Sequence, residues 1–420
     1  MNQLIIRALR YLICLTGLMI AGQINADELA TDNVIGQKFT IDSQVLNESR
    51  DIQIYFPPSY DQSKADYPVL YILDGQRLHL LGVSILQSFR SNVKKSPEFI
   101  VIGINNHQDK RFEHFKKLDF LEFIEKELVP HIDKNYRTSN ERVLFGWEFA
   151  GAYVVEALMK KPGLFSGHIA ASPYPVHQTW FAPITRLEML EKKLDKLDSH
   201  LYFSVSDGEQ LVGDGTAKLN ALLESKAPSS LRWKYRVIPD EEHLSTAHAT
   251  LYQGLKDYFY PYEEFQIYSL DKFEKAGGLK NFYKHNKLRA KRYGFDEQPS
   301  AWSMFTIVRN AIRADDFEKF KLYMNEFKDS NMIADSRLGN ANSIAQFYVK
   351  YKAHNQAISV YLKMAQAHPD NARIHNELGD IYVKLNDKAK AKMHYKNSVE
   401  LAKKSDDSRL GEYKKDLAQL

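Results

Sequence analysis

The stretch VLFGWEFAGAYVVEALMKKPGLFSGHIAASP, residues 143–173, predicts a strand, a sharp turn, a helix and a second strand. The apolar run that ends at Gly146 is typical of a buried strand, and helical spacing follows it until another apolar run begins at Gly167. The turn itself reads Gly146-Trp147-Glu148-Phe149-Ala150. A carboxylate, that of Glu148, therefore stands between a strand and a helix.

The same alternation of strands and helices extends in both directions and covers residues 36–262. YPVLYILDG (67–75) and EFIVIGINN (98–106) are continuous apolar runs, as in strands that are covered on both faces. DIQIYFPP (51–58) alternates polar and apolar residues, as in a half-exposed antiparallel strand. The pattern predicts an α/β domain with a mostly parallel sheet and an antiparallel start.

A different pattern follows this domain. Residues 263–300 are polar and charged and are expected to form a connector. From residue 301 to 420 no strand pattern remains, and two segments repeat at a spacing of 34 residues, which pairs Tyr348 with Tyr382, Ala357 with Ala391 and Tyr361 with Tyr395. Together with Leu378, Gly379 and Pro369, these residues fit a tetratricopeptide-like all-α domain, with generic helical hairpins as the alternative. Such repeats predict a protein or peptide partner.

The N-terminus has the pattern of a secretory signal peptide. Arg7 and Arg10 precede an apolar run from Tyr11 to Ala21, and cleavage is expected after Ala26, which leaves residues 27–262 as the α/β domain. An uncleaved membrane anchor is the alternative. The prediction is a periplasmic or secreted protein without a membrane span in its mature chain.

Composition excludes several classes of protein. A length of 420 residues predicts two or three domains, and a formal net charge of +4 gives no argument for a nucleic-acid partner. The one cysteine, Cys14, lies inside the predicted signal peptide, so the mature chain has no thiol and no disulfide. The histidines are scattered without metal-ligand spacing, and no metal and no cofactor are expected.

In seven segments the chain resembles the putative esterase family of α/β-hydrolases, which includes esterase D-like and enterochelin esterase-like proteins. The matching segments are YPVLYILDG, VIGINN through Arg111, FIEKELVPHIDKNYRT, LFGWEFAG, FSGHIAASP, LYFSVSDGEQ and IPDEEHLSTAHATLYQGLKDYF. The resemblance implies an α/β-hydrolase sandwich and hydrolysis of a carboxylic ester. It also implies a serine in a G-x-S-x-G turn, then an acid and then a histidine along the chain.

This resemblance assigns roles to individual residues. His243 matches the histidine, with His248 as the weaker candidate, and Glu209 matches the acid best by position, with Asp207 as the alternative. The backbone N–H of Phe149 and one near Gly75 and Gln76 would stabilise an oxyanion. Trp147, beside the tip of the turn, would line the pocket or pack under the turn.

Glu148 departs from the family at the position of the nucleophile. Serine chemistry is excluded there, because a carboxylate that attacks an ester forms an anhydride. Two other roles for Glu148 are a nucleophile at saturated carbon, like the aspartate of haloalkane dehalogenases, and an ion-pair partner of His243. Two functions are therefore compatible with the sequence. One is a hydrolase that retains activity on a small-molecule ester or acyl conjugate, and the other is an inactive pseudo-esterase that acts as a binding or scaffold module.

Overall fold

The structure, a computed structural model, describes residues 33–420 except 91–93, 107–109, 118, 174–189 and 195–196. The predicted signal peptide and its cleavage site at Ala26 lie outside the described residues. Among the helices that are described, none is both long and apolar enough to cross a membrane.

The described N-terminal part of the chain is built on one eight-stranded sheet. Its strands lie in the order β1-β2-β4-β3-β5-β6-β7-β8, and only the β1–β2 and β2–β4 pairs are antiparallel. The strands are β1 (Gln37–Ser43), β2 (Glu48–Tyr55), β3 (Tyr67–Leu73), β4 (Ile100–Ile104), β5 (Thr138–Trp147), β6 (Gly167–Ala171), β7 (His200–Ser206) and β8 (Arg232–Ile238). The predicted α/β fold with a mostly parallel sheet is confirmed.

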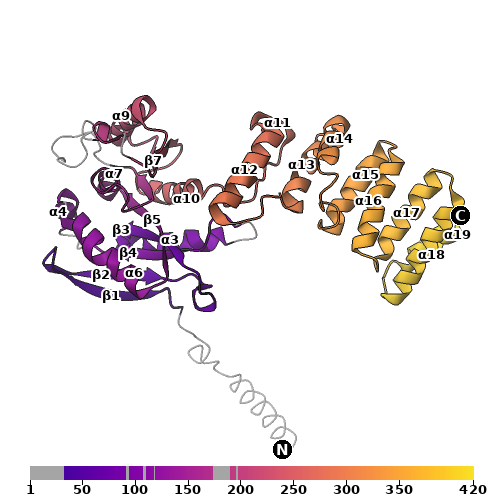
Figure 1. The fold of residues 1–420 in the computed structure, drawn as a ribbon, viewed down its shortest axis with the longest axis horizontal. Helices are drawn as coiled ribbons and strands as arrows, with labels where there is room; N and C mark the ends of the chain where they lie inside the picture. Colours follow the sequence, from indigo (N-terminus) through magenta and orange to yellow (C-terminus); the bar gives the residue numbers. More distant parts are fainter. Residues whose placement is uncertain (1–32, 91–93, 107–109, 118, 174–189, 195–196) are drawn as a thin grey trace, which may run out of the picture.

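Helices cover both faces of this sheet (Figure 1). One face packs against α3 (Gly75–Phe89) and α10 (Thr246–Tyr258) through residues such as Ile72 and Phe145. The other face packs through the alternate residues of the same strands, such as Tyr71 and Leu144. It is covered by α5 (Asp119–Phe123), a π-helical turn (Ile124–Leu128), α6 (Val129–Asn135), α7 (Phe149–Lys160) and α9 (Gln210–Lys226). Burial on both faces explains the continuous apolar runs of the central strands.

The parallel strands bring four connections to the same edge of the sheet. Because β3, β5, β7 and β8 run in one direction, the residues that follow them all lie at their carboxyl ends. Asp74 follows β3, Glu148 follows β5 and Glu209 lies between β7 and α9. His243 lies in the connection from β8 to α10. The topology thus places these four residues near one edge of the sheet.

The C-terminal part of the chain is helical and extends away from the sheet in Figure 1. The first residues of α15 and α17 are 34 positions apart, as are those of α16 and α18. The helices are α13 (Ala301–Arg313), α14 (Phe317–Glu326), α15 (Leu338–Lys350), α16 (His354–Ala367), α17 (Ala372–Lys384), α18 (Lys388–Lys404) and α19 (Leu410–Ala418). Gly379 lets two of them approach, since a Cβ there would lie 2.4 Å from the Tyr395 ring. Helical hairpins with this offset are present, and their identity as tetratricopeptide repeats stays a prediction.

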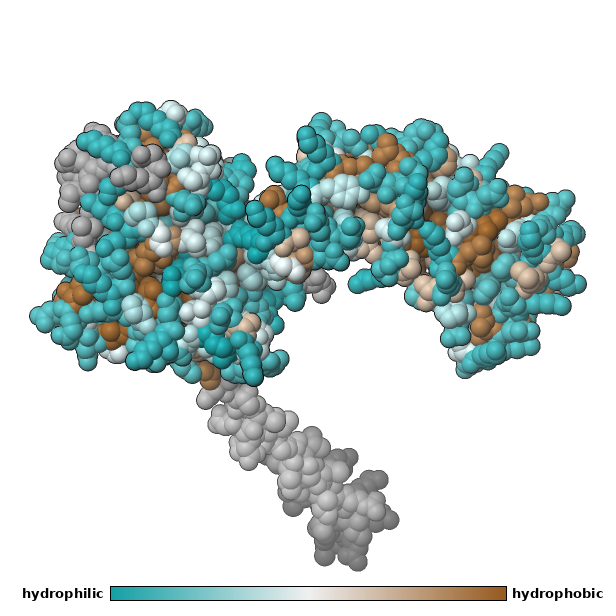
Figure 2. Space-filling view, in the orientation of Figure 1, coloured by the Kyte–Doolittle hydropathy of each residue, from teal (hydrophilic) through white to brown (hydrophobic). Residues whose placement is uncertain are grey.

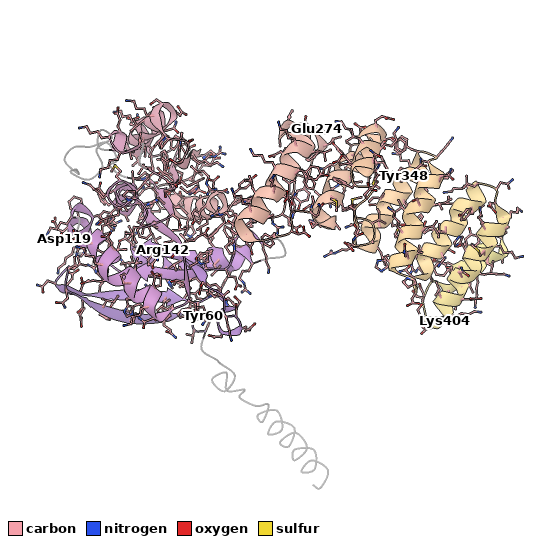
Figure 3. All side chains as sticks on the ribbon, viewed as in Figure 1. Tyr60, Asp119, Arg142, Glu274, Tyr348 and Lys404 are labelled. Carbon is pink, nitrogen blue, oxygen red and sulfur yellow. The ribbon has the colours of Figure 1, made fainter. Side chains whose placement is uncertain are left out.

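The surface in view is mostly hydrophilic over both the sheet region and the helical region (Figure 2). The aromatic residues of the helical region lie largely inside it. Phe320 and Tyr361 are fully buried, and Tyr348, labelled in Figure 3, packs its ring 4.7 Å from that of Phe320. These rings therefore serve as the core of the helical region, as helical spacing in the sequence indicates.

Residues 263–300 differ from the predicted connector. They contain α11 (Leu270–Lys275) and α12 (Gly278–Tyr293), and Phe273 and Phe282 of these helices are fully buried in the core of the helical region. Glu274 of α11, labelled in Figure 3, accepts a hydrogen bond from the hydroxyl of Tyr323 in α14. The sequence does not predict these two helices, because residues 263–300 contain few apolar residues among many charged ones.

Helix α12 also binds the sheet region. Arg292 donates to the carbonyl oxygen of Tyr258 at 2.6 Å, and the Tyr293 hydroxyl donates to that of Phe259 at 2.7 Å. Both carbonyls belong to the end of α10, where the last backbone oxygens of a helix have no partner within the helix. The segment therefore packs with the helical region and caps the last helix of the sheet region.

Candidate functional site

The turn between β5 and α7 holds Glu148 in a rare backbone conformation, with φ of 60° and ψ of −120°. Such a conformation costs a residue with a side chain roughly 1–3 kcal/mol, so the surrounding structure must maintain it. The Glu148 N–H donates to the Ala171 oxygen at 2.9 Å. A Cβ on Gly146 would lie 2.3 Å from the Ala150 oxygen, so only glycine fits there. Small residues thus allow a sharp turn with Glu148 at its tip.

The carboxylate of Glu148 lies between two cationic groups. Its Oε2 accepts a hydrogen bond from Arg111 Nη1 at 3.0 Å, and its Oε1 is 4.0 Å from His243 Nε2. The second distance is too long for a hydrogen bond but short enough for strong electrostatic attraction when His243 is protonated. The Glu148 side chain is 25% exposed, so the pair is partly accessible to solvent rather than buried in the interior.

His243 is also bound to Glu209. His243 Nδ1 makes a short hydrogen bond with Glu209 Oε1. The other oxygen, Oε2, accepts from the backbone N–H of Ser206 at 2.9 Å, from the Ser206 hydroxyl at 3.0 Å and from the Ser172 hydroxyl at 2.8 Å. Both oxygens of Glu209 are therefore occupied, in a side chain that is only 7% exposed.

These contacts shift the protonation of both groups. Burial raises the pKa of Glu209, but the hydrogen bonds from His243, Ser206 and Ser172 outweigh it and hold the pKa below its usual value. The hydrogen bond to Glu209 raises the pKa of His243, burial opposes it, and the charge of Glu148 adds to the rise. An ionised Glu209 and a readily protonated His243 follow.

The structure brings Glu209, and not Asp207, to His243. Asp207 Oδ2 instead accepts from the backbone N–H of Asp240 at 3.3 Å. Asp207 and Glu209 are two positions apart in the loop before α9, and the hydrogen bonds from Ser206 orient only Glu209 toward the imidazole. His248, the weaker histidine candidate, is an exposed residue of α10.

Trp147 fixes the loop that contains His243. Its indole N–H donates to the His243 carbonyl oxygen at 2.9 Å, and its ring lies 4.8 Å from the imidazole. The guanidinium of Arg77 lies 5.1 Å above the same indole. Trp147 therefore contacts the histidine directly, from the position before Glu148 in the turn.

Arg111 is a site residue to which sequence reasoning gave no role. Its Nε and Nη2 both bind Oδ2 of Asp74, at 2.9 and 2.8 Å, and Asp74 is fully buried. Asn106 Nδ2 donates to the other oxygen of Asp74 at 3.0 Å. Burial lowers the pKa of Arg111, while Asp74 and Glu148 raise it and prevail. Arg111 is thus a fixed cation that reaches Glu148 from one side.

Neither Asp74 nor Glu148 lies near Arg111 in sequence, since each is 37 positions away. No spacing rule links residues at such distances. Arg111 and Asp74 both fall within segments that resemble the esterase family, and this resemblance was the one available signal.

The predicted oxyanion donors lie at two helix N-termini. Gly75 and Gln76 begin α3, and Phe149 begins α7. The first backbone N–H groups of a helix have no partner within it and can bind an anion. Gly75 is required by close packing, because a Cβ there would lie 2.5 Å from the carbonyl carbon of Gly103 in β4. The Gln76 side chain accepts from the Asn106 N–H at 2.9 Å. The role of these donors stays a prediction.

Within the described residues, no group of three or more His, Cys, Asp or Glu side chains could hold a metal ion. The described site is made of Glu148, His243, Glu209 and Arg111, with their ion pairs and hydrogen bonds.

An α/β sheet with a residue presented on a sharp turn after β5, and a histidine–carboxylate pair beside it, defines an α/β-hydrolase-fold protein. Residues 43–253 match the model of the family described as "Putative esterase". The match spans half of the chain, and the chain belongs to this esterase family.

Curated relatives match the chain over shorter stretches. Ferri-bacillibactin esterase BesA of Bacillus subtilis is 27% identical over 158 residues, with 30% of this chain and 55% of that protein covered. The uncharacterized protein YbbA of the same organism is 27% identical over 144 residues, with 30% and 57% covered. The chain thus spans about half the length of the curated relatives it matches.

Solved structures share the fold. An IroE-like serine hydrolase from Shewanella oneidensis has a TM-score of 0.51 at 24% identity, covering 69% of this chain and 98% of that one. An uncharacterised protein from Capnocytophaga ochracea has a TM-score of 0.51 at 18% identity, covering 78% and 93%. At these identities the likeness supports the fold alone.

Proposed function

We propose that this esterase-family protein binds an ester-like or hydroxyl-rich ligand at the former catalytic site and does not perform acyl transfer through the turn after β5. The observation behind the proposal is the position of Glu148, whose carboxylate is 3.0 Å from Arg111 and 4.0 Å from His243. A carboxylate that attacks an ester forms an anhydride, and an ion pair with Arg111 further weakens it as a nucleophile.

The remaining groups suit binding. Arg111, Glu148 and His243 together offer donors and acceptors in a partly exposed cluster, and helix N-termini at Phe149 and Gly75 add backbone N–H groups. The relative named ferri-bacillibactin esterase supplies a first ligand to test. Ferri-bacillibactin should bind the wild-type chain without being consumed.

The test replaces the one group that is missing. Glu148→Ser should create hydrolysis of short activated esters and labelling by a fluorophosphonate, since general base catalysis by His243 contributes roughly 10²–10⁴-fold. Glu148→Ala, which removes the carboxylate without adding a hydroxyl, is the matched control and should stay inactive. Both gains should disappear in Glu148→Ser/His243→Ala.

Two results would contradict the proposal. Labelling of the wild type at a serine would reveal a nucleophile elsewhere in the chain. A well-folded Glu148→Ser that neither hydrolyses esters nor reacts with the fluorophosphonate would mean that more than the hydroxyl has been lost from the catalytic apparatus.

The intact pair of His243 and Glu209 favours one alternative function, hydrolysis by activated water. In that reaction His243 Nε2 takes a proton from water, the hydroxide attacks the ester carbonyl, and the proton passes to the departing alkoxide as its bond to carbon breaks. Turnover by the wild type without fluorophosphonate labelling, lost in His243→Ala and kept in Glu148→Ala, would establish it.

Export is the second part of the proposed function. The pattern of Arg7, Arg10 and the apolar run to Ala21 supports cleavage after Ala26. Mass spectrometry of the protein from its native host should find an N-terminus at Asp27, and recovery of intact Met1 from a membrane fraction would contradict this.

A further inference from the structure

A cavity of about 480 Å³ lies between β8 and α10, apart from the site around Glu148. We call it the β8–α10 groove. Its floor and rim include Lys95, Tyr202, Lys234, Arg236, Lys256 and Tyr260. Arg111, Glu148, Glu209 and His243 are not among the described residues that line it. Its volume falls within the range of about 300–1,000 Å³ that is usual for small-molecule sites.

The sheet register explains the chemistry of the groove. Strand β8 is the last of the sheet, and its Lys234 and Arg236 pair with Tyr202 and Ser204 of β7. Because side chains alternate along a strand, both cations point to the face that α10 covers, where Tyr202 lies. Two cations two positions apart on an edge strand thus face one buried tyrosine.

The groove has more positive than negative side chains. Four cations line it, whereas its carboxylates are those of Asp257 and Glu263. Asp257 already binds Lys234 Nζ at 2.8 Å and His200 Nε2 at 2.9 Å. Glu263 is 3.8 Å from Lys256 Nζ.

Two cations therefore remain for a ligand. Within the described part of the chain, neither Arg236 nor Lys95 pairs with a carboxylate, and Lys95 donates instead to the hydroxyl of Tyr252. A net positive concave surface concentrates anions.

Tyr202 adds a donor at the floor. Its side chain is 2% exposed, and its hydroxyl has no hydrogen-bond partner among the residues that the structure describes. Because Tyr202 lines the groove, its unpaired hydroxyl is available to a ligand there. Burial raises the pKa of Tyr202 to about 12, with Arg236 opposing, so the hydroxyl keeps its proton at neutral pH.

We propose that the β8–α10 groove binds a small organic anion, whose phosphate, sulfonate or carboxylate group contacts Arg236, Lys95 and the Tyr202 hydroxyl. Pro239, Ile238 and the half-exposed ring of Tyr260 line the same groove and pack against the apolar body of the ligand. This site is independent of the function proposed for Glu148.

Calorimetric titration of the full chain with naphthalene-1-sulfonate and with 1-naphthol tests the proposal, because the two probes share a ring system and differ in charge. The sulfonate should bind one site per chain, with an affinity that falls as salt is added. 1-Naphthol should bind at least about tenfold more weakly, and inorganic phosphate should compete with the sulfonate.

Variants then locate the site. Arg236→Gln and Lys95→Gln should each weaken the sulfonate about tenfold, the effect of losing one charge-assisted hydrogen bond. Lys64→Gln, an exposed cation outside the groove, should bind as the wild type does. Circular dichroism checks that each variant is folded.

Three outcomes would overturn the assignment. The first is equal affinity for the two probes, and the second is wild-type affinity in both Arg236→Gln and Lys95→Gln. The third is loss of binding in Arg111→Gln alone, which would move the anion to the site around Glu148.

Discussion

Two glutamates approach the same histidine from two connections of the sheet, and they differ in almost every physical respect. Glu209, after β7, accepts four hydrogen bonds from His243, Ser206 and Ser172 and is nearly buried. Glu148, after β5, has one hydrogen bond from the Arg111 side chain, is 4.0 Å from His243 and is a quarter exposed. One carboxylate is fixed by four hydrogen bonds, and the other is held by a single one at the tip of a strained turn.

This difference shows that the identity of a side chain does not define its role. Hydrogen bonds from Ser206 and Ser172 hold the Glu209 carboxylate in one orientation, so it can fix the tautomer of His243. Glu148 has a strained backbone and one side-chain hydrogen bond. We therefore expect substitutions of Glu209 to have large effects and substitutions of Glu148, other than to serine, to have small ones.

The largest expected effect tests whether Glu209 orients the histidine. In the Glu148→Ser background, Glu209→Gln should return ester hydrolysis nearly to the wild-type level, a fall of roughly 10²–10⁴-fold, because His243 loses the carboxylate that orients it. The matched control, Asp207→Asn in the same background, should change the rate little, since Asp207 binds a backbone N–H. Steady-state kinetics measures both, and the reverse ranking would exchange the roles of the two acids.

The next effect concerns stability. Glu209→Ala should lower the free energy of unfolding by about 1–3 kcal/mol, because Ser206, Ser172 and His243 lose a buried partner. Glu148→Ala should cost only about 0–1 kcal/mol, since its ion pair is partly exposed and Arg111 keeps Asp74. Urea unfolding of the two variants measures the difference. An equal decrease in the free energy of unfolding would contradict the distinction between the two glutamates.

The smallest effect is on the titration of His243. Its pKa is raised mainly by the hydrogen bond to Glu209 and less by the charge of Glu148. Glu209→Gln should therefore lower this pKa more than Glu148→Gln does, as followed by NMR of the imidazole protons. A larger decrease in Glu148→Gln would reverse the ranking of the two glutamates.

The pKa shifts of His243 and Glu209 determine how the stability of the fold depends on pH. The raised pKa of His243 stabilises the fold below the unfolded value of about 6.5 and loses this effect as the pH rises through the folded pKa. The lowered pKa of Glu209 stabilises the fold above about 4.5 and loses this effect as the pH falls through the folded pKa. The stability difference between wild type and Glu209→Gln should thus be largest between about pH 4.5 and 6.5.

Much of the fold could be predicted because its pattern is local. Strands covered on both faces must be continuously apolar, and YPVLYILDG and VLFGW satisfy this without reference to other residues. The offset of 34 residues likewise predicts the helices of the C-terminal region. Residues 263–300 escaped prediction because Phe273 and Phe282 find their partners in helices farther along the chain.

The site was predictable only in part. The resemblance to the esterase family gave His243 and left Glu209 and Asp207 open, since two positions in one loop cannot be separated without the course of that loop. Arg111 had no local signal, because its partners Asp74 and Glu148 are each 37 positions away. These contacts exist because β3 lies between β4 and β5 in the sheet, so the residues that follow the three parallel strands meet at the same edge.

By itself the sequence determined the succession of strands and helices in the sheet region, and it determined that a carboxylate without a hydroxyl stands on the turn after Trp147. Only the tertiary structure decided that this carboxylate is bound by Arg111, that Glu209 holds His243, and that Arg236 and Tyr202 meet in a second cavity. The physical reason is that burial of one or both faces of a strand or helix gives its apolar residues a short, regular spacing, and this spacing can be read directly from the sequence. The partner of a polar side chain instead depends on which strands, distant in sequence, become neighbours in the sheet. This is decided only when the sheet has formed.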